Sequence, residues 1–560
     1  MFASLHIVTM LWLDYLWFMR KITLSFSLLV ALSAIFCPAG QAQITIEGNF
    51  NDWDGLQMVN DPAGDHNYFD LLQTRVYSDS SFVSFQIHAA QDWQLNSEYG
   101  LTLYLDLDAN AQTGQAYEGM GADLVWRFYD REGTWNGQTV AHHQIGMFSA
   151  PTVTSDRFEV SFDRNGPLQF GDSIRFAWVS MNGADDKLPD SGHIDHVLGG
   201  LLFSYAPIGL QKDPTHVRVM TYNVEHDGLV DPVLGPKIAQ VVSQVAPDII
   251  TFNELWDTPA AQVKQILDTL MPLPVGWYTA KLFNGNVTAS QFPITQSYQH
   301  DLEDRILVST IDLPSSFATD LVVANLHLKC CNADDRRQEQ VDGLVNFYRD
   351  LQTSGGQIDV PFGTAFVVMG DMNLVGDKQQ LETILTGDIQ DEATFGTDFL
   401  PDWDGSPIAD PIPLQNTQRQ SYTWPGQTSS YYPGRLDFVF YSDYALRAEK
   451  TFVVSTQLAY DASDHLPVVV DFAWNQISGQ GEFRKPEVEI LPNPASTNVT
   501  VRWPAKSVQY LELIDGQGRL IREFRISKRQ TELTIELSNL ASGTYYIKVN
   551  RQYGYRLIHQ

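Results

Sequence analysis

The chain has 560 residues, a formal net charge of -31 and an apolar content of 44%. This length is enough for several domains, and the ordinary apolar content excludes a wholly disordered chain. The strong acidity favours solubility and repels polyanions at long range, but it does not indicate a fold.

The N-terminal residues 1–42 have the pattern of a secretory signal. Met19-Arg20-Lys21 is a basic start, and an apolar core and small residues suited to cleavage follow it at Ile22–Phe36 and Ala39–Ala42. This pattern predicts Met19 as the true start and a mature chain that begins near Gln43. A membrane anchor is the alternative, although the apolar core is short for a span. No other stretch is apolar enough to cross a membrane.

Residues 43–204 predict a β-sandwich, because short alternating runs are separated by Gly, Asn and Asp. The expected strands are Ile44–Gly48, Phe82–Ile87, Leu101–Leu107, Arg157–Phe162 and Ile174–Val179. The region resembles carbohydrate-binding modules of family nine at Ile46–Trp53, Asp61–Asp65 and Leu105–Gly114. This resemblance implies a glycan ligand, and a spacer without a ligand is the alternative.

One loop of this region carries polar side chains that can bind a cation. Asp106, Asp108 and Asn110 alternate along the chain, a spacing that can collect oxygen ligands for calcium. The complete calcium loop with its terminal Glu is absent from the sequence. A polar turn without an ion is therefore the alternative.

A linker is expected at residues 205–215, and several strands of the following region, 216–475, end in polar side chains. These are Asn223 after His216–Tyr222, Glu254 after Asp248–Asn253, His327 in Leu321–Leu328, Asp371 and Asn373 after Val367–Gly370, Asp437 in Gly434–Ser442, and Asp464 and His465 in Ala462–Pro467. Strand ends of an α/β sheet gather at one edge, where ligands bind. The side chains are therefore expected to form one site.

Helical spacing of apolar residues predicts helices between these strands, at 229–245, 258–271 and 336–351. Strands that alternate with helices and close with antiparallel pairs predict an α/β sandwich of two packed sheets with flanking helices. The expected chain is therefore multidomain, with this sandwich between an N-terminal and a C-terminal β-sandwich.

The polar strand ends, in this order, resemble the endonuclease/exonuclease/phosphatase superfamily over residues 216–472. This superfamily contains pancreatic-type deoxyribonucleases, abasic-site endonucleases, bacterial sphingomyelinases and inositol polyphosphate phosphatases. The segment Asn286–Ile294, with its Phe-Pro-Ile, matches a further strand of the family. One motif alone could be an ordinary turn. The whole set implies a phosphoric ester hydrolase that uses Mg²⁺ or Mn²⁺.

The resemblance also implies roles for individual residues. Glu254, supported by Asp464, would bind the metal, since magnesium takes one or two protein carboxylates and keeps several waters. Asp371 and Asn373 would orient and activate the attacking water. Asn223 would hold the phosphate or the geometry of Asp371.

The two histidines would complete the chemistry. Asp437 would accept a hydrogen bond from the ring of His465 and fix its tautomer, and this pair would act either as general base or as phosphate clamp. His327 would donate to a phosphate oxygen or the leaving group, as in the deoxyribonuclease and sphingomyelinase branches. Arg336 and Arg337 could contact phosphate, but ion pairing on the helix surface is the favoured alternative.

Two adjacent cysteines, Cys330 and Cys331, lie three residues after His327. We expect two packed thiols. A disulfide between neighbours is strained, and two thiols alone do not make a zinc site, so these remain the alternatives.

The Gly- and Gln-rich segment 476–486 predicts a second linker, and residues 487–560 have a purely β pattern. The expected strands are Val488–Ala495, Val499–Trp503, Leu511–Ile514, Leu533–Leu537 and Gly543–Val549. This segment resembles the C-terminal sorting domain of the type nine secretion system of Bacteroidetes, which implies export across the inner and outer membranes and contact with the secretion machinery. A generic β-sandwich is the alternative.

Together these patterns predict a secreted, metal-dependent phosphodiesterase, with nucleic acid as the favoured substrate. A sphingomyelinase, phospholipase C-like or inositol phosphate phosphatase activity is the alternative, and an inactive surface glycan-binding protein is a hypothesis of another class. A nucleic-acid substrate would need a local basic groove, for which the candidates are Lys281, Lys329, Arg336, Arg337 and Arg435. For lipid, Tyr431–Pro433 is the candidate membrane-contacting loop.

Overall fold

The computed structural model describes residues 43–180, 186–200, 205–282, 284–300, 305–353, 355–475, 488–503, 508, 510–517, 519–526, 530–549 and 553–560. The expected signal 1–42 and linker 476–486 lie outside the described residues. A small compact unit includes residues 43–45 and 50–54, where the η1 turn Asn51–Trp53 lies and Thr45 N donates to Asp52 Oδ2 at 2.6 Å. The other described residues belong to a second unit.

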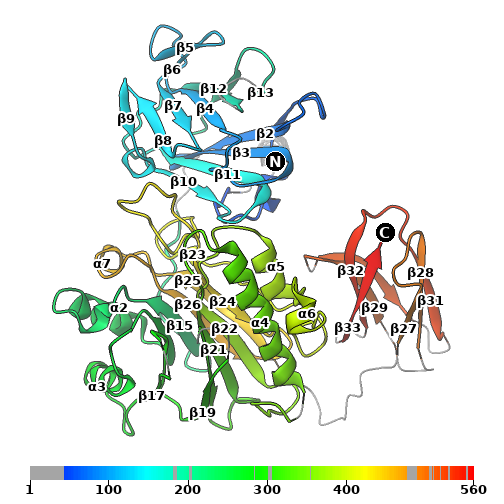
Figure 1. Ribbon diagram of the computed structural model, residues 1–560. Coiled ribbons are helices and arrows are strands. Elements are labelled where there is room, and N and C mark those ends of the chain that lie inside the picture. The colour runs from blue at the N-terminus through cyan, green and yellow to red at the C-terminus, as the bar shows by residue number, and fades with distance from the viewer. Residues whose placement is uncertain are drawn as a thin grey trace, which may run out of the picture. The chain divides into compact units, whose positions relative to one another are not determined.

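The N-terminal part of this second unit contains two antiparallel sheets (Figure 1). One sheet has the order β1 (Met58–Asn60), β2 (Leu71–Ser78), β3 (Phe82–Trp93), β11 (Ser155–Asp163) and β10 (Met147–Ala150). The other has the order β13 (Lys187–Leu188), β12 (Ser173–Val179), β4 (Thr102–Asp106), β7 (Leu124–Arg127), β8 (Glu132–Trp135) and β9 (Gln138–Val140), with β14 (Ile194–Val197) also beside β12. A small hairpin joins β5 (Gln115–Tyr117) and β6 (Met120–Ala122).

Inward-facing residues of both sheets form one core, in which Phe85, Phe176 and Trp178 pack ring against ring. The β-sandwich expected here is therefore present. The strand expected at Ile44–Gly48 is wrong, because this segment forms only an isolated bridge at Ile46. Gly48 has φ +81°, a left-handed conformation that does not continue a strand.

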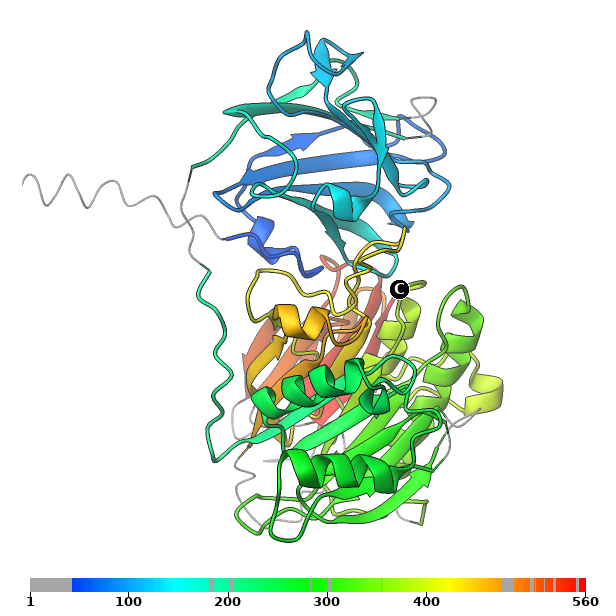
Figure 2. The ribbon, with the colours of Figure 1, turned by 90° about the vertical axis from the view of Figure 1, so that its left-hand side faces the viewer.

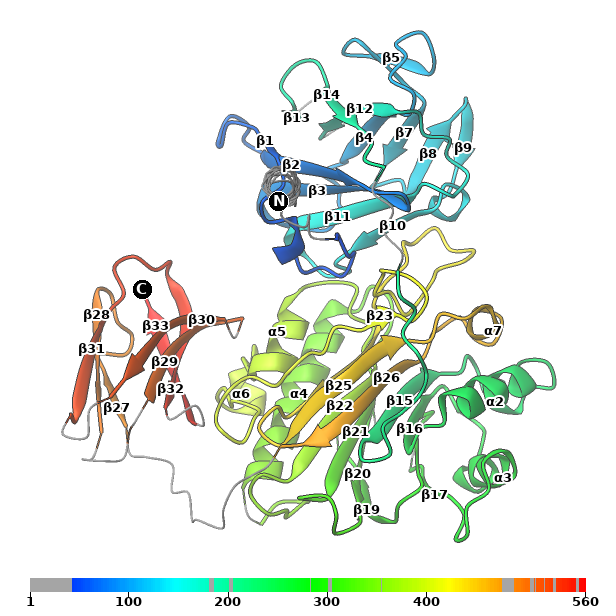
Figure 3. The ribbon, with the colours of Figure 1, turned by 180° about the vertical axis from the view of Figure 1, so that it is seen from behind.

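The central part of the chain contains two larger sheets. One has the order β17 (Tyr278–Ala280), β18 (Val287–Ser290), β16 (Ile249–Asn253), β15 (Val217–Asn223), β26 (Val468–Trp474), β25 (Leu446–Val453) and β23 (Leu414–Gln415). The other has the order β19 (Ile294–Gln299), β20 (Ile306–Ile311), β21 (Leu321–His327), β22 (Ala365–Asp371) and β24 (Asp437–Tyr441). Figure 3 shows β25, β26 and β15 side by side.

Helices cover the outer faces of these sheets. In Figure 2, α2 (Leu234–Val245) and α3 (Ala260–Leu270) lie over the sheet that contains β15 and β16. The helices α4 (Asp334–Gln352) and α5 (Gln379–Thr386) pack on the sheet that contains β21 and β22. The short helices are η2 (His142–Gln144), η4 (Gly228–Val230), α6 (Glu392–Phe395) and α7 (Gln457–Tyr460). Two sheets with flanking helices agree with the predicted α/β sandwich.

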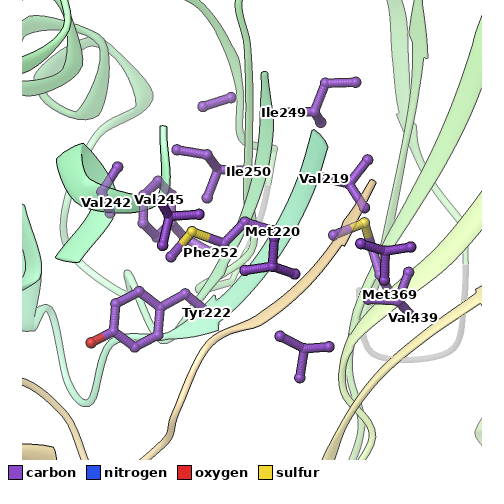
Figure 4. Close-up of a cluster of buried hydrophobic side chains, with 14 of the residues drawn as sticks. Val219, Met220, Tyr222, Val242, Val245, Ile249, Ile250, Phe252, Met369 and Val439 are labelled. Carbon is purple, nitrogen blue, oxygen red and sulfur yellow. The ribbon is translucent and has the colours of Figure 1, made fainter. Parts of the chain in front are cut away.

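The sheets pack through a continuous apolar core. Val219 of β15 belongs to the same buried cluster as Met369 of β22 and Val439 of β24, so the cluster crosses from one sheet to the other. Figure 4 shows this cluster, with Val219, Met220, Tyr222, Val242, Val245, Ile249, Ile250, Phe252, Met369 and Val439 labelled. This core holds the two sheets in the register on which the site depends.

One predicted helix begins later than expected. Residues 229–233 were expected to be helical, but Gly228–Val230 forms a 3-10 turn and α2 begins at Leu234. Asp231 Oδ1 accepts the backbone N–H groups of Val233 and Leu234, at 2.7 and 2.9 Å. Asp and Pro at positions 231 and 232 favour this new start over a continuous helix.

The C-terminal segment contains two small sheets. The first has the order β27 (Glu489–Leu491), β28 (Asn498–Arg502) and β31 (Glu532–Glu536), and the second has the order β30 (Leu520–Arg525), β29 (Tyr510–Asp515), β32 (Gly543–Val549) and β33 (Tyr553–His559). The sequence analysis missed β30 and β33. None of the helices in the described part of the chain has the length and apolarity that a membrane span requires.

Candidate active site

Strand register aligns the polar ends of five central strands. Asn223 at the end of β15 pairs with Asn253 at the end of β16. In the other sheet, His327 pairs with Asp371, and Asp371 pairs with Asp437. Since the two sheets pack face to face, these ends form one polar cluster above an apolar core.

Asn223 connects two carboxylates that are far apart in the sequence. Its Nδ2 donates to Glu254 Oε1 at 3.3 Å and to Asp371 Oδ2 at 3.1 Å. Asn223 and Asp371 are both buried, whereas the side chain of Glu254 keeps 18% of its surface exposed. Of the two carboxylates, Glu254 is therefore the one that solvent can reach.

A left-handed turn next to Glu254 was missed by the sequence analysis. Glu225, His226, Asp227 and Glu254 itself all have φ between 45° and 64°. The turn directs the backbone N–H of His226 and its ring Nδ1 at Glu254 Oε2, both at 3.0 Å. Burial raises the pKa of Glu254, but the His226 N–H, His327 and Asn223 outweigh it and hold this pKa below its ordinary value.

Asp371 and His327 share a poorly solvated environment. Burial raises the pKa of Asp371 to about 7, although His465 opposes this shift. Burial lowers the pKa of His327 to about 4, although Glu254 opposes it. His327 Nε2 lies 3.6 Å from Asp371 Oδ2, and the His327 ring lies 5.6 Å from that of Trp256. The neutral ring of His327 can therefore act as a donor without carrying a charge.

His465 and Asp437 form the hydrogen-bonded pair that the sequence predicted. The distance from His465 Nδ1 to Asp437 Oδ2 is 2.8 Å, and His465 Nε2 lies 3.8 Å from Asp371 Oδ2. Burial alone would lower the pKa of His465, but Asp437 and Asp371 raise it to about 10. Ser463 Oγ fixes the preceding turn by donating to Asn223 O at 2.8 Å.

A buried amide network supports the cluster from below. Asn253 Nδ2 contacts Asn286 Oδ1, Asn325 Oδ1 and Leu326 O within 3.1 Å, and its Oδ1 accepts Asp371 N–H at 3.0 Å. This network fixes the backbone that carries Asp371 relative to the other sheet. The contacts within this network were not predictable, because polar residues in apolar strands show no pairing pattern in the sequence.

The remaining predicted residues of the site have distinct surroundings. Asn373 has φ 50°, and its Nδ2 donates to Leu328 O at 3.2 Å, so the amide holds the neighbouring chain. Asp464 is exposed next to His465, and it raises the pKa of Glu225 after the larger effect of burial. Glu225 is thus a third carboxylate beside Glu254 and Asp464. These oxygen-rich donors fit a hard cation such as magnesium, which prefers carboxylate and water ligands.

The two candidate phosphate-binding arginines are outside this cluster. Arg337 is fully buried, and its guanidinium donates to Lys329 O, Cys331 O, Gln380 Oε1 and Asp334 Oδ1 within 2.9 Å. Arg336 pairs with Glu339. The Arg336 pair agrees with the alternative of ion pairing on the helix surface, whereas Arg337 pairs with Asp334 in a buried position.

Two other cations of the expected basic groove also have partners. Lys281 Nζ donates to the carbonyl oxygens of Leu255, Trp256 and Thr258 within 3.0 Å. The Arg435 guanidinium makes a two-bond pair with Asp410. Three of the five expected cations, Arg336, Arg337 and Arg435, are thus paired with carboxylates, whereas Lys281 bonds only neutral carbonyl oxygens and Lys329 is exposed without an ion-pair partner among the described residues.

Two further candidate features were placed by the structure. Cys330 and Cys331 are exposed free thiols with their sulfur atoms 2.8 Å apart, so the expected packing of these thiols is wrong. Their loop turns outward, since Cys331 has φ 69°. In the N-terminal sandwich, Asp106 and Asp108 lie close to Asp123, and Asn110 stays in the same loop through its N–H bond to Asp108 Oδ1.

Comparisons with known families agree with this geometry. Residues 220–465 match the model described as Endonuclease/Exonuclease/phosphatase family. Residues 489–558 match the model of a secretion system C-terminal sorting domain, which points to export and to a secreted or cell-surface protein. None of the curated proteins is detectably similar to the chain.

Several solved structures are similar at low identity. The human Nocturnin catalytic domain with bound sulfate anion is 17% identical over 48% of this chain and 97% of that chain, with a TM-score of 0.32. An endonuclease/exonuclease/phosphatase from Beutenbergia cavernae is 18% identical over 61% and 100%, with a TM-score of 0.34. A beta toxin variant from Staphylococcus aureus with bound magnesium ions is 18% identical over 46% and 99%, with a TM-score of 0.28.

Proposed function

We propose that the endonuclease/exonuclease/phosphatase domain at residues 220–465 is a metal-dependent phosphodiesterase of an exported protein. The observation that carries this proposal is that the Asn223 amide donates to both Glu254 and Asp371, at 3.3 and 3.1 Å. The nearby His327 and the His465–Asp437 pair add two imidazoles to the same cluster.

Glu254 and Asp464 are the residues that would hold a magnesium or manganese ion, with Glu225 beside them. A bound divalent cation supplies charge that stabilises a phosphoryl oxygen as negative charge develops. The partial exposure of Glu254 suits this role, because a metal ligand in a hydrolase must be reachable from solvent and substrate.

The chain's own residues would position the reacting groups. Asp371, with its pKa raised to about 7 by burial, can take a proton from a water molecule near neutral pH. His465, whose pKa Asp437 and Asp371 raise to about 10 against the effect of burial, stays cationic and can hold a phosphate oxygen. The neutral His327 can donate to another phosphate oxygen, while Asn223, whose two amide hydrogens already bond Glu254 and Asp371, holds the geometry of Asp371. This arrangement favours the phosphate clamp over the general base as the role of His465.

Chelation and substitution test the proposed metal dependence. Hydrolysis of bis(p-nitrophenyl) phosphate should need magnesium or manganese, and Glu254→Gln should reduce kcat/KM by about 1,000-fold or more, since metal charge stabilisation is worth several kcal/mol. Asp371→Asn and His465→Ala should also lose most activity. Glu392→Gln, at an exposed glutamate of α6, is the matched control and should retain activity. Full turnover by Glu254→Gln in the presence of a chelator would refute the assignment.

Nucleic acid is our preferred substrate, and a phospholipid head group is the second. His226 lies on one side of Glu254, and the ring pair Trp256–His327 lies on the other. These rings are the reason for the preference, because an aromatic face can stack on a base. The loop considered for membrane contact is packed in part, because Tyr432 is half-buried and donates to Phe128 O at 3.0 Å. Tyr431 is exposed but stacks with Arg131.

Two substrates offered in parallel decide between these classes. The protein is incubated with plasmid DNA and with sphingomyelin vesicles, each with magnesium and at low and high salt. Plasmid cleavage that decreases with salt would support a nucleic-acid substrate, with a shallow slope because three of the five expected groove cations are paired with carboxylates. Head-group release from vesicles with intact plasmid would establish the lipid alternative. Activity on neither, with intact metal binding, would favour the glycan-binding hypothesis.

A further inference from the structure

A second group of carboxylates lies in the N-terminal sandwich, where β13 of one sheet lies next to β2 of the other. The loop between β1 and β2 contributes Asp61, Asp65 and Asp70, and the segment around β13 contributes Asp186 and Asp190. Oxygen atoms of Asp61, Asp65 and Asp190 lie within 4.8 Å of one another, and Asp65 also lies within this distance of Asp186 and His66.

This negative charge has little compensation from cations. None of the five carboxylates pairs with a Lys or Arg among the residues that the structure describes, and His66 Nε2 lies 3.5 Å from Asp186 Oδ1. Burial raises the pKa of Asp61 to about 7, with smaller contributions from Asp186, Asp190, Asp65 and Asp70. The five side chains therefore act on one another electrostatically at short range.

Two buried oxygen atoms give independent support for a ligand. Asp70 is only 8% exposed, and its Oδ1 has no hydrogen-bond partner in the described part of the chain. Its other oxygen accepts Gly64 N–H at 2.9 Å, which fixes the carboxylate beneath the 61–65 loop. Asp61 Oδ2 is also buried without a partner among the described residues. A buried carboxylate oxygen without a donor is unfavourable unless a cation binds it.

The candidate calcium loop at Asp106 differs in this respect. Asp106 Oδ1 accepts the N–H groups of Asp108 and Asn110, and its Oδ2 accepts Gly121 N–H at 3.2 Å. Asp123 Oδ2 accepts Leu107 N–H at 2.8 Å. Backbone donors thus already satisfy this loop. In the other cluster they satisfy Asp186, through the N–H groups of Leu71 and Lys187, but leave one oxygen of Asp61 and one of Asp70 without partners in the described part of the chain.

We propose that Asp61, Asp65, Asp70, Asp186 and Asp190 form a calcium site that joins the two sheets of the N-terminal sandwich. Calcium accepts many oxygen ligands at variable geometry, which suits five carboxylates from two segments. Zinc would favour fewer ligands with more nitrogen or sulfur, and His66 is the one such donor in this cluster. A bound ion would fix the 61–70 loop against β13, which already lies next to β2.

Calcium binding to the full chain tests this proposal. Equilibrium dialysis with radioactive calcium, in excess magnesium to occupy the catalytic carboxylates, should detect a site that Asp65→Asn/Asp190→Asn weakens by at least tenfold. Both residues are exposed, so the substitutions leave the core intact. Asp108→Asn should keep the binding, and Asp195→Asn, at another exposed aspartate of the sandwich, is the matched control.

Hydrogen exchange locates the bound ion. Calcium should slow exchange in peptides that cover residues 61–71 and 186–190 of the wild-type chain, including Leu71 N–H, which donates to Asp186 Oδ2 at 2.6 Å. The double variant should not show this slowing. Calcium affinity unchanged in the double variant, loss of binding in Asp108→Asn alone, or binding of zinc without calcium would each overturn the proposal.

Discussion

Arg337 illustrates how a residue that suggests catalysis can instead hold a loop. Its donors are used by two carbonyl oxygens, one amide and one carboxylate. Arg337→Met should therefore lower the stability of the central region by about 3 kcal/mol, because it leaves buried acceptors unpaired. The measurement is the urea midpoint followed by tryptophan fluorescence.

The neighbouring Arg336 provides the control for this prediction. Arg336→Met should change the midpoint by less than about 1 kcal/mol, since a partly exposed pair contributes little. A phosphate-binding role for Arg337 would give another result, a raised KM with unchanged stability.

His196 predicts a pH dependence for the N-terminal sandwich. Burial lowers the pKa of His196 below its ordinary value, and its Nε2 lies 2.9 Å from Ser78 Oγ. The unfolded state therefore binds the proton first, and stability should decrease as pH falls through the ordinary histidine range towards the folded pKa. His196→Gln should reduce this decrease in thermal midpoints between pH 7.5 and about 5. An unaltered slope in His196→Gln would contradict the assignment.

Individual site residues were predictable where a polar side chain ends an apolar strand. Asn223, His327 and Asp371 have this pattern, and the structure brings their side chains together. Glu225 and His226 were not predictable. A left-handed turn directs them toward Glu254, and residues other than glycine show little sequence preference for this conformation.

At the scale of elements, β21 and β22 approach each other closely at Gly370. This residue has φ 148°, and a Cβ there would lie 1.9 Å from Leu326 O. Gly370→Ala should therefore destabilise the central region by about 3 kcal/mol and displace Asp371, with loss of activity. Urea denaturation and turnover of the same preparation measure both effects.

A glycine in α4 serves as the control for that substitution. A Cβ at Gly343 would meet only Phe395, at an ordinary 3.6 Å. Gly343→Ala should be neutral or stabilise by up to about 1 kcal/mol, since alanine is the better helix former. Equal losses in the two variants would show that the close approach at Gly370 is not the cause.

Element types followed the sequence more closely than element boundaries. Apolar periodicity predicted α3 and α4 to within two residues at each end. The β30 and β33 strands were missed because their charged and aromatic residues give a weak apolar alternation. The packing of β13 against β2 of the other sheet was also not predictable, because the residues in contact are more than 100 positions apart in the sequence.

At the scale of the whole molecule, the sorting domain makes a prediction about processing. Export should yield a mature form that begins near Gln43 and lacks the region after about Lys485, because a secretory signal is expected at residues 1–42 and a sorting domain matches residues 489–558. Intact-mass measurement of protein from the culture medium checks both ends. A full-length product that stays in the cytoplasm would contradict both.

The position of β26 has a consequence for the order of assembly. This strand, the last of the central region, lies between β15 and β25 rather than at a sheet edge, and His465 precedes it by three positions. During synthesis, β15 can pair early with β16, but its antiparallel partner β26 appears only about 250 residues later, and such distant pairing slows folding. The sheet that carries Asn223 is therefore complete only after the last strand of the central region, which follows His465, has been synthesised.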